Sequence, residues 1–175
     1  REITIKIMSI TAIARKLYFA KRQRELQRHL THGAEMQRDV LASLLQRADD
    51  TEYGRNHAFS TIRDYETFCA DVPLNDYDSL KQDIDRMRHG EKDVLWPGQV
   101  RWYAKSSGTT NDKSKFIPVS GEGLQRIHYQ GGTDTVAFYL MNNPQSRIFD
   151  GKALILGGSH QANYNVHGSL VGDLS

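Results

Sequence analysis

The sequence predicts an α/β fold in which a helical N-terminal hairpin precedes a region of mixed helices and strands. Two observations carry this prediction. Apolar residues recur at helical spacing through most of the first 48 positions, and two strand-like runs at 100–105 and 116–119 enclose a polar loop. A short apolar run at 153–156, bounded by glycines, adds a buried-type strand. A chain of 175 residues is long enough to bury one substantial core.

The first expected unit is a helical arm over residues 1–50 that packs on the main domain. A helix is expected over 9–30, with a serine as its cap, and His32-Gly33 ends it. A second amphipathic helix is expected over 34–48, because its apolar side chains form one stripe. These two helices are expected to pack together as a hairpin.

Residues 51–175 are expected to form the main structural unit. A short helix is predicted over 61–69, where apolar residues share one face. A longer helix is predicted next, with Asn75 or Asp76 as its cap and Gly90 as its left-handed end.

The second strand is followed by another predicted helix. Ser120 is expected to cap it, and the helical pattern runs to Leu140. Gly131-Gly132 is expected to kink or break this helix, because glycine disfavours helix interiors. The tail from 159 to 175 is rich in Gly, Asn and Ser and holds only short strand-like pieces.

The loop from Ser106 to Lys115 concentrates donors suited to a polyphosphate. Phosphate oxygens need converging donors, and successive backbone N–H groups in a turn can form an anion-binding concavity. Glycine lets the backbone approach a ligand closely, and Lys113 or Lys115 can add a positive charge. The candidate phosphate-binding residues are Ser106, Ser107, Gly108, Thr109 and Thr110. On composition alone a plain polar turn is the stronger interpretation, since the same residue types dominate turns.

A Walker-type phosphate loop is the obvious competitor. Gly108 and Lys113-Ser114 have the spacing G-x-x-x-x-K-S, but the glycine that should immediately precede the lysine is missing. A Walker loop also opens a helix, whereas the apolar run 116–119 contains a proline and is typical of a strand. The strand–loop–strand setting therefore disfavours this alternative.

The loop, with its flanking strands, resembles the first nucleotide-binding motif of the adenylate-forming enzymes. Its leading Ser-Ser and its ten-residue spacing are most similar to one branch, the auxin-responsive acyl acid–amido synthetases and their bacterial relatives. Three upstream stretches, 53–59, 68–77 and 84–91, are similar to a Y-G-x-x-x-x-F element, an F-x-x-x-V-P-L-x-x-Y segment and an I-x-x-x-x-x-G-E turn of that branch. Two features depart from the pattern: Asn111-Asp112 replaces the frequent Gly-Gly, and Ser114 replaces proline before the lysine.

The resemblance implies the N-terminal part of an adenylate-forming large domain, truncated at its C-terminus. It implies ATP and Mg²⁺ as cofactors, and a small-molecule carboxylic acid and an amine or amino acid as partners. The five residues of the motif would cradle the phosphates, and Lys115 would be the catalytic residue that neutralises the leaving pyrophosphate. The expected reaction is adenylation of the acid followed by amide formation, and the chain alone is expected to be inactive.

Two other functions stay open at this point. One is an adenylating ligase that forms acyl-CoA, because the motif alone does not identify the acceptor. The other is a non-catalytic helical binding module. We expect no metal cluster, because the chain has a single cysteine, and we name no metal ligand. The resemblance implies that the protein ligand of Mg²⁺ lies outside this chain, whereas Asp112 either points away from the phosphates or lies near the Mg²⁺.

Charge is distributed unevenly along the chain. The formal net charge is +2, but residues 1–47 hold ten Lys/Arg against four Asp/Glu, and residues 48–100 hold six against twelve. We expect the basic arm to dock on the acidic segment of its own chain, since no nucleic-acid motif is present. No apolar run is long enough to cross a bilayer, so we expect no membrane and no nucleic-acid partner, and a cytoplasmic location.

Overall fold

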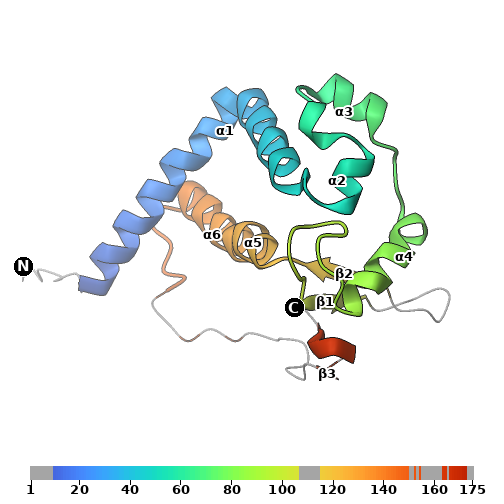
Figure 1. Ribbon diagram of the computed structural model, residues 1–175. Coiled ribbons are helices and arrows are strands. Elements are labelled where there is room, and N and C mark those ends of the chain that lie inside the picture. The colour runs from blue at the N-terminus through green and yellow to red at the C-terminus, as the bar shows by residue number, and fades with distance from the viewer. Residues whose placement is uncertain are drawn as a thin grey trace, which may run out of the picture.

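A small mixed sheet lies at the bottom of the molecule in Figure 1, with helices above and beside it. The structure is a computed structural model that describes residues 10–106, 115–149, 152, 154, 163, 164 and 166–172. The α/β class expected from the sequence is confirmed, whereas the strand expected at 153–156 falls largely outside the described residues.

The helical elements outnumber the strands within these residues. They are α1 (Ile10–Ala48), α2 (Glu52–Asn56), η1 (Phe59–Thr61), α3 (Tyr65–Asp71), α4 (Tyr77–Arg88), α5 (Gly121–Gly123), η2 (Leu124–Tyr129), α6 (Gln130–Asn142) and η3 (Val166–Gly168). The strands are β1 (Trp102–Lys105), β2 (Phe116–Val119), β3 (Asn163–Tyr164) and β4 (Leu170–Gly172).

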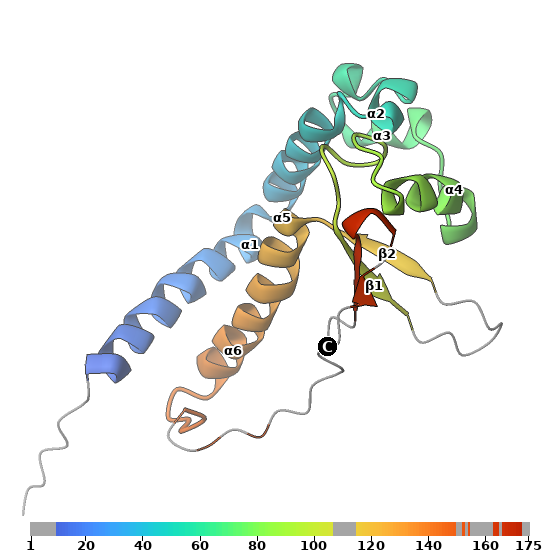
Figure 2. The same ribbon diagram turned by 60° about the horizontal axis from the view of Figure 1, so that its bottom comes forward.

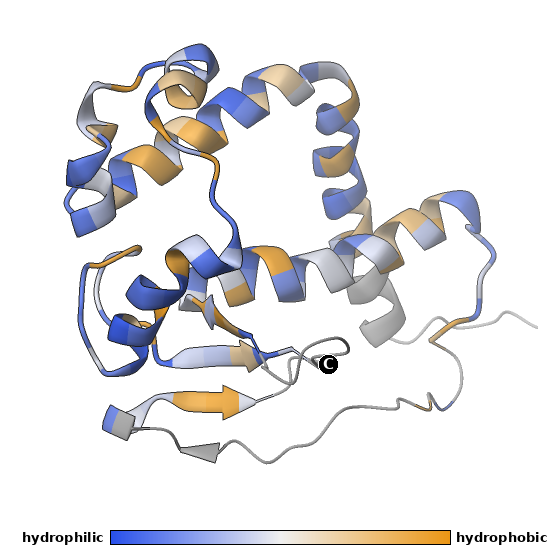
Figure 3. Cartoon of the chain, turned by 90° about the vertical axis from the view of Figure 1, so that its right-hand side faces the viewer, coloured by the Kyte–Doolittle hydropathy of each residue, from blue (hydrophilic) through white to orange (hydrophobic). Residues whose placement is uncertain are grey.

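Helix α1 is bent at His32, whose φ of −125° and ψ of 21° are not helical. The two predicted helices and the break between them are therefore present, but they open from the bend as two diverging arms (Figures 1 and 3). The two arms contact different elements and do not form the expected closed hairpin. Arg22 on the first arm binds Asp134 of α6 with Nε–Oδ1 at 2.6 Å, and the second arm leads directly into α2.

The basic arm docks on acidic residues other than those expected. Arg22 pairs with Asp134, and Arg47 pairs with Glu122 of α5 at 2.8 Å. The acidic segment 48–100 instead supplies carboxylates to its own Arg86. Sequence position misled here because α5 and α6 return to the side of α1 only in the folded chain.

Helix α4 follows the prediction closely, whereas α3 does not. In α4 the Asp76 carboxylate accepts from Ser79 N at 2.8 Å, and Gly90 closes the helix with a φ of 93°. The helix predicted from 61 begins only at α3, because Ile62 is extended and buried and Asp64 is the actual cap.

The four strands have the order β2-β1-β4-β3. Strands β1 and β2 pair antiparallel, with Lys105 opposite Phe116, and β1 and β4 pair parallel. The hairpin lies between α4 on one side and the α5–η2–α6 helices on the other (Figure 2). The buried core between α4 and the sheet consists of Ile84, Met87, Val94, Val100, Tyr103 and Val171.

The helix predicted after β2 is continuous through its two glycines. Ser120 caps it as expected, accepting from Gly123 N at 2.9 Å. The irregularity falls earlier, in the wider π-helical turn η2, and the backbone remains helical across Gly131-Gly132. The predicted kink at the glycines is therefore wrong.

Candidate functional site

The two ends of the predicted phosphate loop are joined at the tip of the β1–β2 hairpin. Ser106 N donates to the Lys115 carbonyl at 3.0 Å. Lys115 N in turn donates to Ser106 Oγ at 3.2 Å, where a regular antiparallel rung would use a backbone carbonyl. The Ser106 hydroxyl thus acts as an acceptor in this rung, and its own proton remains to be donated elsewhere.

Two of the six predicted site residues fall in the described part of the chain. Ser106 and Lys115 meet at the base of the loop. The other four lie outside the described residues: Ser107, Gly108, Thr109 and Thr110. Asn111-Asp112, the departure from the family pattern, also lies outside them.

A tyrosine that the sequence analysis did not single out as a site residue contacts the loop exit. Tyr77, the first residue of α4, accepts a hydrogen bond from Phe116 N at 3.0 Å. The Lys115 ammonium lies 5.3 Å from the centroid of the Tyr77 ring. The available signal was the place of Tyr77 at the end of the V-P-L-x-x-Y segment, which marked the residue without indicating its contacts.

Phe116 is also held from the face of its ring. The Arg88 guanidinium carbon lies 3.6 Å from the ring centroid, and Arg88 pairs with Asp85 at 3.0 Å. Tyr103 is fully buried nearby in β1, and burial raises the pKa of its hydroxyl to about 12 although Arg88 opposes the shift. Tyr103 therefore stays neutral at physiological pH, and its side chain belongs to the buried core.

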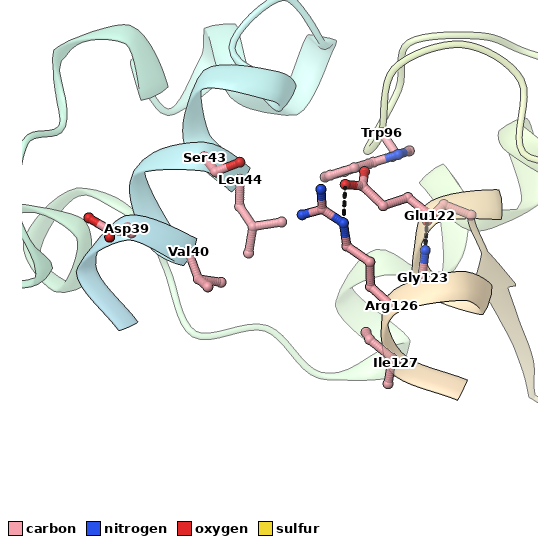
Figure 4. Close-up of a pocket in the computed structure, with 10 residues that line it drawn as sticks. Asp39, Val40, Ser43, Leu44, Trp96, Glu122, Gly123, Arg126 and Ile127 are labelled. Carbon is pink, nitrogen blue, oxygen red and sulfur yellow. Dashed lines mark hydrogen bonds and ion pairs between the residues drawn. The ribbon is translucent and has the colours of Figure 1, made fainter. Parts of the chain in front are cut away.

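A cavity of about 670 Å³ lies between the second arm of α1 and the α5–η2 turn (Figure 4). Its apolar wall includes Val40, Leu44, Trp96 and Ile127, and Arg126 and Glu122 form an ion pair at one side. Its lining also includes Ser120, which directly follows β2. The predicted phosphate loop joins the opposite end of β2, at Phe116. The cavity and the predicted phosphate loop therefore lie at opposite ends of the hairpin.

A known protein family matches most of this chain. The sequence profile described as the GH3 family N-terminal domain matches residues 22–175. The chain belongs to the GH3 family. The resemblance to the auxin-responsive amido synthetases is thereby confirmed.

Curated GH3 relatives are amide-forming enzymes. Indole-3-acetic acid-amido synthetase GH3.6 of Arabidopsis thaliana is 33% identical over 97 residues, which cover 55% of this chain and 16% of the relative. GH3.5 of the same plant, also an indole-3-acetic acid-amido synthetase, is 33% identical over 108 residues, covering 61% and 18%. The matches thus span less than a fifth of the length of these relatives.

Solved GH3 structures share the fold. The GH3.15 acyl acid amido synthetase matches with a TM-score of 0.73 and 25% identity over 86% of this chain and 27% of that chain. A structure of AtGH3.15 in complex with 2,4-DB matches with the same TM-score and 26% identity. Over the matched part, the fold of this chain is therefore that of the N-terminal region of a GH3 acyl acid amido synthetase.

Two further findings concern membrane-spanning helices and metal-binding groups. Within the described ranges, no helix is both long and apolar enough to cross a bilayer. Nor do the described residues bring three or more His, Cys, Asp or Glu side chains together in a metal-binding group.

Proposed function

We propose that the full-length protein containing this chain is an ATP-dependent acyl acid–amido synthetase. The observation that carries the proposal is the ten-residue loop whose ends, Ser106 and Lys115, are joined at the hairpin tip in a GH3 chain. Because the matched regions are a small part of the relatives' length, activity is proposed for the full-length protein, and the chain alone is proposed to be inactive.

The proposed reaction has two steps. A carboxylate oxygen attacks the α-phosphorus of ATP, the bond to the β-phosphate oxygen breaks, and pyrophosphate leaves. An amine nitrogen then attacks the acyl carbon, the bond to the AMP oxygen breaks, and the amine loses a proton as the amide forms. The names of the relatives favour this amine acceptor over coenzyme A.

Each residue of the loop has a distinct proposed role. Ser107, Gly108, Thr109 and Thr110 cradle the phosphates, and Ser106 adds the hydroxyl proton that its rung with Lys115 leaves available. Lys115 places positive charge beside the leaving pyrophosphate, since nucleotidyl transfer depends mainly on positioning and charge stabilisation. These donors suit phosphate oxygens, whereas no described cluster of acids suits a metal.

Mg²⁺ bound to the phosphate oxygens would supply further charge neutralisation. We assign it no ligand among the described residues, because they bring no such group of side chains together. The proposed contribution of this chain to the first step is therefore the positioning of the phosphates and the positive charge of Lys115.

Substitution of Thr109 tests the proposal in the full-length protein. Thr109→Ala removes a hydroxyl donor to a charged phosphate, and ATP–pyrophosphate exchange is expected to fall about 10- to 100-fold. Exchange is measured over a panel of carboxylic acids, and amides are then identified by mass spectrometry with a panel of amines. Thr61→Ala, an exposed threonine at the end of η1, is the matched control. Undiminished exchange in Thr109→Ala would overturn the assignment of the loop.

A further inference from the structure

Strand β2 lies at the edge of the described sheet, and one side chain covers its outward donor. The bond from Ser106 N shows that the Lys115 carbonyl faces β1. Backbone groups alternate along a strand, so the next outward N–H groups belong to positions 116 and 118. Position 118 is proline and has no N–H. Phe116 N is therefore the outward donor of β2, and Tyr77 Oη accepts from it at 3.0 Å.

The same tyrosine faces the ammonium of Lys115. The Nζ atom lies 5.3 Å from the Tyr77 ring centroid, within the range in which an aromatic face attracts a cation. The Tyr77 hydroxyl and ring thus contact two consecutive residues, the backbone of Phe116 and the side chain of Lys115. These are the residues at which the chain leaves the loop.

The backbone of Tyr77 is itself fixed. It is the first residue of α4, directly after Asp76, which forms a reciprocal capping box with Ser79. At the other end of the same helix Arg88 stacks on the Phe116 ring. Residues 77 and 88 are eleven positions apart, about three helical turns, so they project from one face of α4. Helix α4 therefore holds the start of β2 at two points.

We propose that Tyr77 is a positioning residue for Lys115, which it holds at the exit of the phosphate loop so that the ammonium faces the leaving pyrophosphate. This inference rests on the proposed function, because it assumes that Lys115 neutralises the pyrophosphate. The hydroxyl fixes the backbone beside the lysine, and the ring limits the directions that the flexible lysine side chain adopts. Coulomb attraction falls with distance, so a displaced ammonium stabilises the departing charge less.

Two substitutions separate the hydroxyl from the ring. In the full-length protein, Tyr77→Phe removes the acceptor for Phe116 N and keeps the aromatic face. ATP–pyrophosphate exchange is expected to fall about threefold in this variant. Tyr77→Leu removes both, and a fall of about tenfold is expected. Amide hydrogen exchange at Phe116 is expected to accelerate in both variants, because both lack the hydroxyl acceptor.

A double-mutant cycle shows whether Tyr77 acts through Lys115. In a Lys115→Met background, Tyr77→Leu is expected to lower ATP–pyrophosphate exchange less than twofold, since the ammonium that Tyr77 positions is gone. Calorimetric titration with pyrophosphate gives an independent measurement. Its Kd is expected to rise about fivefold with Tyr77→Leu in the native background, and to stay within twofold in the Lys115→Met background.

Controls keep the two levels of the proposal apart. Tyr65→Leu changes an exposed tyrosine of α3 and is expected to leave exchange and pyrophosphate binding unchanged. Thermal melting by circular dichroism identifies any variant that fails to fold. If Tyr77→Leu is such a variant, Tyr77→Phe replaces it in the cycle, where its threefold effect is expected to vanish beside Lys115→Met.

The outcomes are distinguishable. If Lys115→Met itself leaves exchange unchanged, the proposed role of Lys115 is wrong and the inference fails with it. If Lys115→Met lowers exchange but the Tyr77 variants have no effect, or have the same effect in both backgrounds, Tyr77 is not a positioning residue and the proposed function stands.

Discussion

Gly54 lies where the first turn of α2 meets the end of α1. A Cβ atom at this position would lie 1.9 Å from the carbonyl oxygen of Ala48, far inside any permitted contact. The same turn is closed by Thr51, whose Oγ1 donates to Ala48 O at 2.6 Å and accepts from Gly54 N at 2.9 Å. The glycine of the Tyr53-Gly54 pair is thus required by close packing of two backbones.

Gly54→Ala is expected to destabilise the protein by about 2 to 3 kcal/mol, because the added methyl group must displace backbone. The drop is measured as a shift of the thermal or urea midpoint of the full-length protein. Gly33→Ala, next to the bend of α1, is the matched control: its Cβ would meet nothing within 4 Å. This control is expected to be neutral or stabilising by up to about 1 kcal/mol. Equal effects of the two substitutions would contradict the packing argument.

Single residues show what the sequence could and could not predict about the site. The two apolar runs around the loop predicted a strand–loop–strand element, and β1 and β2 are present, but the bonds that join Ser106 to Lys115 were not predicted. Tyr77 could not be assigned a role, since 38 positions separate it from Lys115 and no periodicity links a helix start to a strand edge. Its contact depends on how α4 packs against the sheet, which is a tertiary property.

At the scale of elements, α4 is tied to its neighbours by Arg86. Its guanidinium binds Glu52 of α2, with Nη1–Oε1 at 3.0 Å, and Glu91 in the turn after α4. Hydrogen bonds from Arg86 hold the pKa of both glutamates below the ordinary value of 4.5. One arginine therefore joins α2, α4 and the following turn.

These shifts predict a pH dependence of stability. A carboxyl group whose pKa is lowered on folding stabilises the native state above its unfolded pKa, and the contribution is lost as pH falls through the folded pKa. Arg86→Met is therefore expected to lower Tm at pH 6 to 7. The difference in Tm between this variant and the native protein is expected to narrow as pH falls below about 4.5. Lys81→Met, an exposed residue of the same helix, serves as the control. A gap that stays constant from pH 7 to 3 would show that these carboxylates do not contribute.

Elements with local signals were predicted well, and those shaped by distant contacts were not. The capping box of α4 and its closing glycine are encoded within a few residues, so its bounds were predictable. The start of α3 was misplaced, because burial draws Ile62 into an extended conformation before the Asp64 cap. The helix after β2 tolerates two glycines, since ion pairs with α1 lie on both sides of them: Arg47 with Glu122 before, and Arg22 with Asp134 after.

At the scale of the whole molecule, the first arm of α1 is anchored on α6. Arg22 makes two hydrogen bonds to the Asp134 carboxylate, Nε–Oδ1 at 2.6 Å and Nη2–Oδ2 at 2.8 Å, and Gln23 donates to Ala137 O. The pair raises the pKa of Arg22 and lowers that of Asp134. Both groups therefore stay charged at physiological pH, and the bidentate pair fixes the angle at which the arm leaves the bend.

Asp134→Asn is expected to weaken this anchor by about 1 kcal/mol, because Arg22 then has no charged partner on α6 and keeps only Glu25 of its own helix. Amide hydrogen exchange along the first arm should then be about five times faster, whereas exchange in α4 should not change. Asp78→Asn, at an exposed position in the first turn of α4, is the control for loss of one carboxylate. Unaltered protection of residues 17–31 would show that the arm is held without the Arg22–Asp134 ion pair.

The parallel pairing of β1 with β4 has a consequence for how the chain folds during synthesis. Trp102 in β1 lies opposite Val119 in β2 but also opposite Leu170 in β4, sixty-eight positions later. A ribosome that adds about 5 to 20 residues per second needs roughly 3 to 14 s to deliver that partner, whereas a hairpin closes in about 1 to 10 μs. The β1–β2 hairpin can therefore form early, while the backbone N–H and C=O groups on the other edge of β1 stay unpaired until β4 emerges. Nascent chains of this protein should be most prone to aggregate, and most in need of a chaperone, during that interval.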